Sequence, residues 1–302
     1  MTNYLQKVLL PQYSHVNKVY CLLAATVFCA LPLCSTEAAA ENILKYDGTT
    51  NIHGNAKTWA AKNEYDGIDI RVTGVDGGYY TDTTEALVLN NQTLNVKGKG
   101  KFVSIINSAQ NKQIDNNGGI YAKGGSTVNF TDVDSIYIAA IAGKEGGNDS
   151  TVISAKDPVR DLKGYTNIVN ISGTTVQLIG SIDVMHSLGS VFFNRNARHT
   201  VNAALSGSDS FWYGSAIGET DERTTVNLSL ADGATWIFNA GKSTLNAGGI
   251  IRNLKLDKGV VLFADAEVWE TYRKTVIKGT DYVLANYRDH NERYSQVEIR
   301  SL

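Results

Sequence analysis

Hydrophobic and polar residues alternate in short runs along most of the chain after residue 41. Six runs share one pattern, in which an asparagine separates two apolar residues, and their asparagines are Asn95, Asn129, Asn170, Asn202, Asn227 and Asn246. Because successive side chains of a strand point to opposite faces, the apolar residues of each run share one face and the asparagine lies on the other. The pattern predicts β-strands with one buried face.

Further strand-like runs follow these segments after polar turns, at 135–138, 176–179, 210–213 and 235–238. Clusters of Gly, Asn and Asp separate the runs, as expected of turns. Helical periodicity is almost absent: the main candidate is 264–274, where Ala264, Val268 and Tyr272 are spaced four residues apart, and 57–65 is a weaker one. The chain is therefore predicted to be an all-β protein.

The spacing of the asparagines favours one β-architecture. The intervals are 34, 41, 32, 25 and 19 residues, which excludes a strict-repeat solenoid and a propeller with blades of fixed length. A right-handed parallel β-helix fits, because its coils of about 20–25 residues tolerate irregular loops between stacked strands. An antiparallel sandwich stays open as the alternative, since alternation does not distinguish parallel from antiparallel pairing.

The first forty residues have the pattern of a secretory signal peptide. Lys7 and Lys18 precede an apolar run at 19–33, and small residues follow up to Ala40. Cleavage is expected between Ala40 and Glu41, which divides the chain into a signal peptide at 1–40 and a β-helical domain at 41–302. The alternatives are a membrane anchor, for which the run is shorter than about twenty residues, and a lipoprotein modified at Cys34.

Composition adds two points to this picture. The chain has 302 residues with a net charge of −2, and this near-neutral balance argues against nucleic acid as a partner. All three cysteines, Cys21, Cys29 and Cys34, lie in the predicted signal peptide. The predicted mature chain is thus free of thiols, and at this size it can build a core without disulfides. No stable membrane span is expected once the signal peptide is removed.

Candidate chemistry is sparse. Three acidic pairs stand close together in the sequence: Asp66 with Asp69, Asp132 with Asp134, and Asp221 with Glu222. Asp132 and Asp134 would project from the same face of a strand, as the paired carboxylates of a glycan-cleaving enzyme do. Aspartates are also common in turns, where they bind their own backbone. No nucleophile motif, metal-ligand spacing or phosphate-binding loop is found, so we predict no cofactor, no metal and no catalytic site.

One segment resembles a known family. Its motifs are Ala234-Thr235-Trp236, then Ser243-Thr244-Leu245, then Leu254-Lys255-Leu256. Together with the Gly/Asn/Thr-rich runs upstream, they resemble the passenger of bacterial autotransporters, a pertactin-like right-handed β-helix, over residues 86–283. The resemblance implies export through an outer-membrane barrel carried by the same polypeptide. Fewer than forty residues follow Ala264, and a barrel needs roughly a hundred or more. We therefore expect that this chain does not encode the export barrel and is a truncated or split passenger, or is released by another route.

These observations predict a secreted or cell-surface module, associated with the outer membrane, that is structural or adhesin-like. Its expected partners are host or matrix surface glycans and proteins. The alternative is a β-helix polysaccharide lyase or hydrolase acting on extracellular glycans, with Asp132 and Asp134 as its candidate residues. A nonfunctional gene remnant is the third reading.

Overall fold

The computed structural model describes residues 42–51, 63–76, 83–109, 116–141, 150–156, 164–184, 197–217, 223–238, 251–263, 283–285 and 297–300. All of them lie in the unit Asn42–Leu302. The predicted signal peptide at 1–40, the cleavage position at Ala40 and Glu41, and the predicted helix at 264–274 lie outside the described residues.

Every regular element of the described residues is a strand, which confirms the prediction of an all-β chain. The strands are β1 (Ile43–Asn51), β2 (Gly67–Asp76), β3 (Thr83–Asn90), β4 (Thr93–Lys97), β5 (Phe102–Asn107), β6 (Asn116–Lys123), β7 (Thr127–Ala140), β8 (Thr151–Ala155), β9 (Thr166–Ile179), β10 (Ser181–Asp183), β11 (Arg198–Ser206), β12 (Phe211–Gly214), β13 (Ala216–Ile217), β14 (Thr224–Ala231), β15 (Thr235–Phe238), β16 (Ile251–Asp257), β17 (Val260–Phe263), β18 (Val283–Ala285) and β19 (Val297–Arg300).

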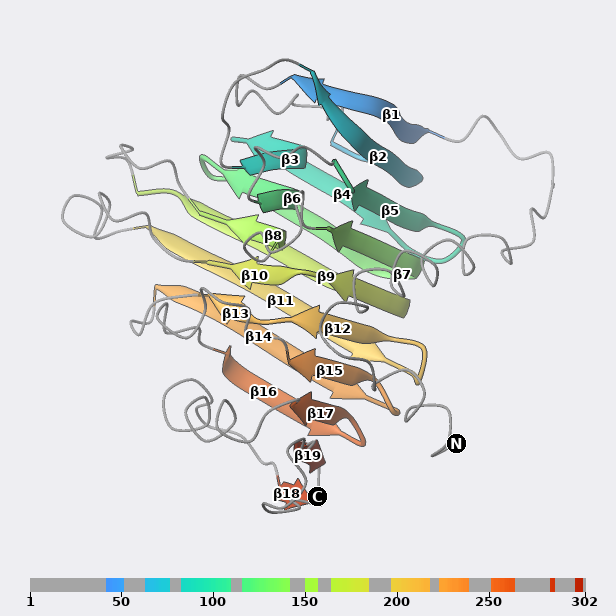
Figure 1. Cartoon of the computed structure of the whole chain (residues 1–302), viewed down its shortest axis with the longest axis vertical. Coiled ribbons are helices and arrows are strands. Elements are labelled where there is room, and N and C mark those ends of the chain that lie inside the picture. Colours follow the sequence, from blue (N-terminus) through green and yellow to red (C-terminus); the bar gives the residue numbers. More distant parts are fainter. Residues whose placement is uncertain are drawn as a thin grey trace. The chain divides into compact units, whose positions relative to one another are not determined.

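The strands form three parallel ladders (Figure 1). The first ladder contains β4, the first halves of β7 and β9, β11, β14 and β16. The second ladder contains β1, β2, β5, the second halves of β7 and β9, β12, β15 and β17. The third ladder contains β3, β6, β8, β10 and β13. Because neighbours within each ladder run parallel, the antiparallel sandwich is wrong for these strands.

The ladders recur in a fixed order along the chain. From β3 to β15 the chain passes through the third, the first and the second ladder in turn, and then returns to the third. The 14-residue strands β7 and β9 each belong to the first ladder at their start and to the second at their end. Antiparallel pairing is found among the described strands at β19, which pairs with β17 and β18.

Apolar side chains of the first ladder are aligned from strand to strand. The register places six fully buried aliphatic residues in one row: Leu94, Val128, Val169, Val201, Val226 and Ile251. Strand β14 shows the alternation most clearly, since every second residue from Thr224 to Leu230 is buried. Each strand therefore completes its buried face against its neighbours rather than alone.

The asparagines form a hydrogen-bonded row on the opposite face of the first ladder. The row consists of Asn95, Asn129, Asn170, Asn202, Asn227 and Asn253, and from Asn129 onward each side-chain Nδ2 donates to the Oδ1 of the preceding member at 2.7–2.8 Å. We call these six residues the asparagine row. The prediction that these asparagines lie on the strand face opposite the apolar residues is confirmed for the first five members.

The sixth member of the row is Asn253, whereas the sequence pattern pointed to Asn246, which lies outside the described residues. Val226 pairs with Ile251 but Asn227 pairs with Asn253, so Arg252 is an extra residue in β16. This bulge interrupts the strict alternation of apolar residue and asparagine. The pattern of apolar residue, asparagine and apolar residue therefore does not extend to this strand.

Two tryptophans, on strands β12 and β15 of the second ladder, lie in the core. Trp212 and Trp236 are fully buried, and their rings stack with centroids 5.0 Å apart and an interplanar angle of 6°. Their Nε1 groups donate to the carbonyl oxygens of Gly180 and Gly214, at 2.9 and 3.0 Å. Trp212 is thus a core residue whose polar group is satisfied.

Candidate binding site

The predicted acidic pair lies where β7 passes from the first to the second ladder. Asp132 has a left-handed backbone with φ of 59°, and its N–H donates to Ser172 Oγ at 3.2 Å. Asp134 Oδ2 accepts the N–H of Gly100 at 3.0 Å. Both aspartates are exposed and flank the buried Val133. Both contacts join β7 to neighbouring parts of the chain, and neither aspartate lines the pocket described below.

The other acidic pairs do not form a site among the described residues. Asp66 accepts the N–H of Asn42 at 3.0 Å and lies 3.2 Å from Lys101 Nζ. The backbone N–H of Asn42, followed by Lys101, lowers the pKa of this carboxyl below its usual range. Asp221 and Glu222 lie outside the described residues. Within the described part of the chain, no three His, Cys, Asp or Glu side chains gather as metal ligands would.

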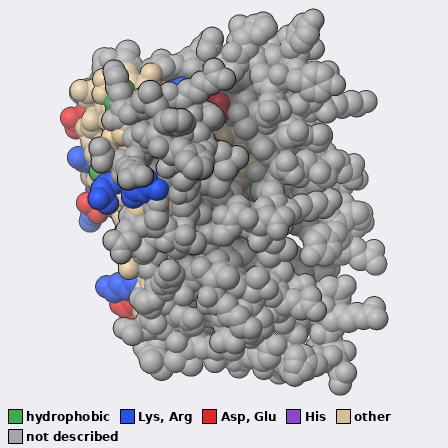
Figure 2. Space-filling model, turned by 90° about the vertical axis from the view of Figure 1, so that its left-hand side faces the viewer, with side chains coloured by type: hydrophobic (Ala, Val, Ile, Leu, Met, Phe, Trp, Pro, Cys, Tyr) green, Lys and Arg blue, Asp and Glu red, His purple; other side chains and the backbone are tan. Residues whose placement is uncertain are grey.

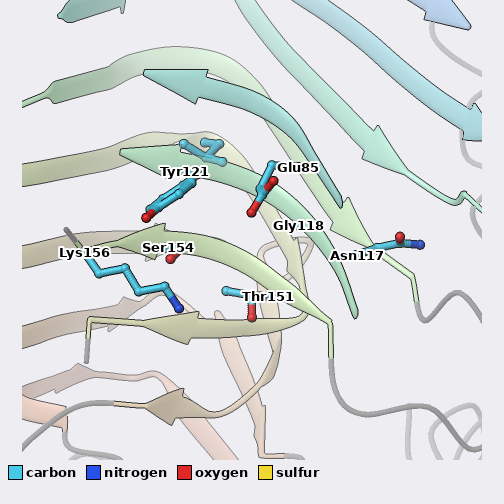
Figure 3. Close-up of a pocket in the computed structure, with 8 residues that line it drawn as sticks. Glu85, Asn117, Gly118, Tyr121, Thr151, Ser154 and Lys156 are labelled. Carbon is cyan, nitrogen blue, oxygen red and sulfur yellow. The ribbon is translucent and has the colours of Figure 1, made fainter. Parts of the chain in front are cut away.

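A cavity of about 190 Å³ lies on the third ladder (Figure 3). Side chains from β3, β6 and β8 and from the residue after β8 surround it. The lining residues are Glu85, Asn117, Gly118, Ile120, Tyr121, Thr151, Ser154 and Lys156. We call this cavity the third-ladder pocket.

Register explains why polar groups meet in this pocket. Tyr121 pairs with Ser154, and Ser154 pairs with Asp183, so three neighbouring strands contribute one row of polar residues. Lys156 lies two residues after Ser154 and forms a salt bridge with the carboxylate of Asp183. The side chain of Asp183 is 8% exposed and that of Lys156 is 34% exposed. The ion pair thus lies at the edge of the pocket.

Ser154 carries the least satisfied polar group of the pocket. The residue is 7% exposed, and its Oγ has no hydrogen-bond partner. A buried hydroxyl without a partner costs about 1–3 kcal/mol, because it has lost its hydrogen bonds to water.

No local sequence pattern distinguishes the residues of this pocket. Tyr121, Ser154 and Asp183 belong to separate segments, and no short motif contains two of them. A polar residue on the outer face of a strand is ordinary when each strand is considered alone. The parallel register of three strands brings these residues together. The pairing of the strands would therefore have to be known before the site could be found.

The described surface carries charges of both signs. Figure 2 shows Lys or Arg and Asp or Glu side chains among the described residues of one face. No described helix has the length and apolar character needed to cross a membrane. The fold defines an all-β protein with parallel sheets. Comparison with protein-family models, curated proteins and solved structures found no match to the chain.

Proposed function

We propose that residues 41–302 form a right-handed parallel β-helix that serves as a secreted or cell-surface scaffold of the adhesin type. The observation that carries this proposal is the fixed recurrence of the three ladders from β3 to β15. A chain that returns to the same three parallel ladders in the same order stacks one coil on the next. Right-handed winding is proposed because parallel strands are joined by right-handed crossovers in about 98% of cases.

The asparagine row and the aligned aliphatic residues support the same architecture. Both place like residues above like residues on successive strands, which is how a solenoid buries its core through contacts between neighbours. Chain between strands can then vary in length without changing the stack. The intervals between row members vary from 25 to 41 residues, in agreement with this property.

The extended outer surface of a stacked architecture supports a scaffold role. Its outer faces form an extended surface, and side chains on that surface vary without loss of the core. The signal-peptide pattern and the thiol-free region after residue 40 support export. We propose that the exported protein binds host or matrix surface glycans and proteins.

Export is tested by producing the full chain in a bacterial host and sequencing the N-terminus of the product recovered outside the cytoplasm. The expected product begins at Glu41. A matched variant, Leu23→Arg, interrupts the apolar run at 19–33 and should stay in the cytoplasm with its N-terminus uncleaved. Retention of the unaltered chain in the cytoplasm would overturn the proposed localisation.

Adhesion is tested with the purified product on immobilised matrix proteins, glycans and epithelial cells. An unrelated folded protein of similar size measures nonspecific adsorption. Saturable binding above that control, or self-association of the chain, is expected of an adhesive scaffold. Absence of both would refute the adhesive part of the proposal.

A further inference from the structure

We propose that the third-ladder pocket binds one neutral sugar unit of a glycan. This inference deepens the proposed function, and its biological setting rests on that function. Three features of the pocket carry it: the size of the cavity, the balance of its charges and the buried hydroxyl of Ser154. Each points to a small ligand that is rich in hydroxyl groups.

The size of the pocket limits the ligand. A volume of about 190 Å³ is below the roughly 300–1,000 Å³ of sites for drug-sized molecules. One six-membered ring with its hydroxyl groups is the scale that fits. Tyr121 lines the pocket, and an aromatic ring offers an apolar surface to the C–H groups of a sugar.

The charges of the pocket favour a neutral ligand. The ammonium group of Lys156 is paired with the carboxylate of Asp183, and Glu85 adds a second carboxylate to the site. Lys123 Nζ lies 5.1 Å from the centroid of the Tyr121 ring. Glu85 and Lys156 are the charged residues that line the pocket, and Lys156 is already paired with Asp183, so the pocket has no excess positive charge with which to select a phosphate or sulfate group.

The polar groups of the pocket match a ligand with several hydroxyls. Carboxylate oxygens such as those of Glu85 accept hydrogen bonds from hydroxyls, and serine and threonine hydroxyls both donate and accept. Ser154 lines the pocket, and its buried Oγ has no partner in the protein. A sugar hydroxyl would satisfy this group and so remove the cost of its burial.

The test titrates the full chain with methyl glycosides of glucose, galactose, mannose, fucose and N-acetylglucosamine. Galacturonate, N-acetylneuraminate and inorganic sulfate form the anionic arm. Calorimetry or ligand-observed NMR with millimolar probe measures the dissociation constants. Saturable binding of at least one neutral glycoside is expected, with no tighter binding of the anions.

Two variants locate the binding to the pocket. Ser154→Ala removes the buried hydroxyl and should weaken binding about 2- to 12-fold, as expected from the loss of one hydrogen bond. Glu85→Gln keeps the shape of the side chain but weakens its acceptor, and should also lower affinity. The matched control is Ser104→Ala, because Ser104 also has a buried, unpartnered Oγ but belongs to β5 on the second ladder. Its affinity should equal that of the unaltered chain.

Three outcomes would overturn the inference: no neutral glycoside binds, the anions bind in preference, or Ser154→Ala and Glu85→Gln bind as tightly as Ser104→Ala. These outcomes are separable from failure of the proposed function, because titration uses purified protein and requires neither export nor adhesion. A chain that adheres to matrix without binding glycosides refutes the inference alone. A chain that binds a glycoside in this pocket but is not exported refutes the localisation alone.

Discussion

Loss of one member of the asparagine row should destabilise the protein measurably. Asn202 stands in the middle of the row, where its Nδ2 donates to Asn170 Oδ1 and its Oδ1 accepts from Asn227 Nδ2, both at 2.7 Å. The Asn202→Ala substitution removes both hydrogen bonds. At about 0.5–1.5 kcal/mol for each net bond, the expected loss of unfolding free energy is about 1–3 kcal/mol.

The Asn202→Asp substitution tests the direction of the bonds in the row. An ionised carboxylate would place an acceptor against Asn170 Oδ1, which is also an acceptor, so its charged form is disfavoured in the folded state. The folded pKa of the new carboxyl is then raised above its unfolded pKa. The variant should therefore be destabilised at neutral pH, and its deficit should shrink as the pH falls through the folded pKa.

The assay is urea unfolding followed by the fluorescence of the buried tryptophans. With a slope of about 3 kcal/mol per molar urea, the loss for Asn202→Ala corresponds to a midpoint lower by roughly 0.3–1 M. Asn63→Asp is the control, since it makes the same charge change at an exposed residue outside the row. If both Asn202 variants unfold at the midpoint of this control, the row does not stabilise the fold and the reasoning is refuted.

Two further predictions concern close packing and charge. Gly214→Ala should destabilise more than Gly98→Ala, because a Cβ at Gly214 would overlap the backbone carbonyl oxygen of Gly180, whereas nothing lies within 4 Å at Gly98; equal urea midpoints would contradict this. Asp66→Asn should destabilise the protein at neutral pH. Folding lowers the pKa of Asp66, so the ionised carboxylate stabilises the folded state at pH values above its ordinary pKa of 3.8. That difference should disappear as the pH falls through the folded pKa, and a difference that persists in acid would count against the bonds to Asn42 and Lys101.

The alternation of side chains was enough to predict most strands of the first ladder. Asn129 lies between two buried apolar residues. This alternation with a period of two identifies a strand, and it shows which face of the strand is buried without knowledge of the strands that pair with it. The same reasoning failed at Asn253, where the extra residue Arg252 breaks the period. It placed Asp132 and Asp134 on one exposed side of β7, as the structure has them, but it did not reveal the positive φ of Asp132, where β7 passes from the first ladder to the second.

Local patterns are sufficient to predict the all-β character of the described residues, because periodicity and turn residues act over a few neighbouring positions. Strand pairing and register emerge only in the folded chain. The stacking of Trp212 on Trp236 and the meeting of Tyr121, Ser154 and Asp183 follow from that register. These contacts join residues from separate strands, and the chain between strands varies in length, so no local pattern contains the information that brings them together.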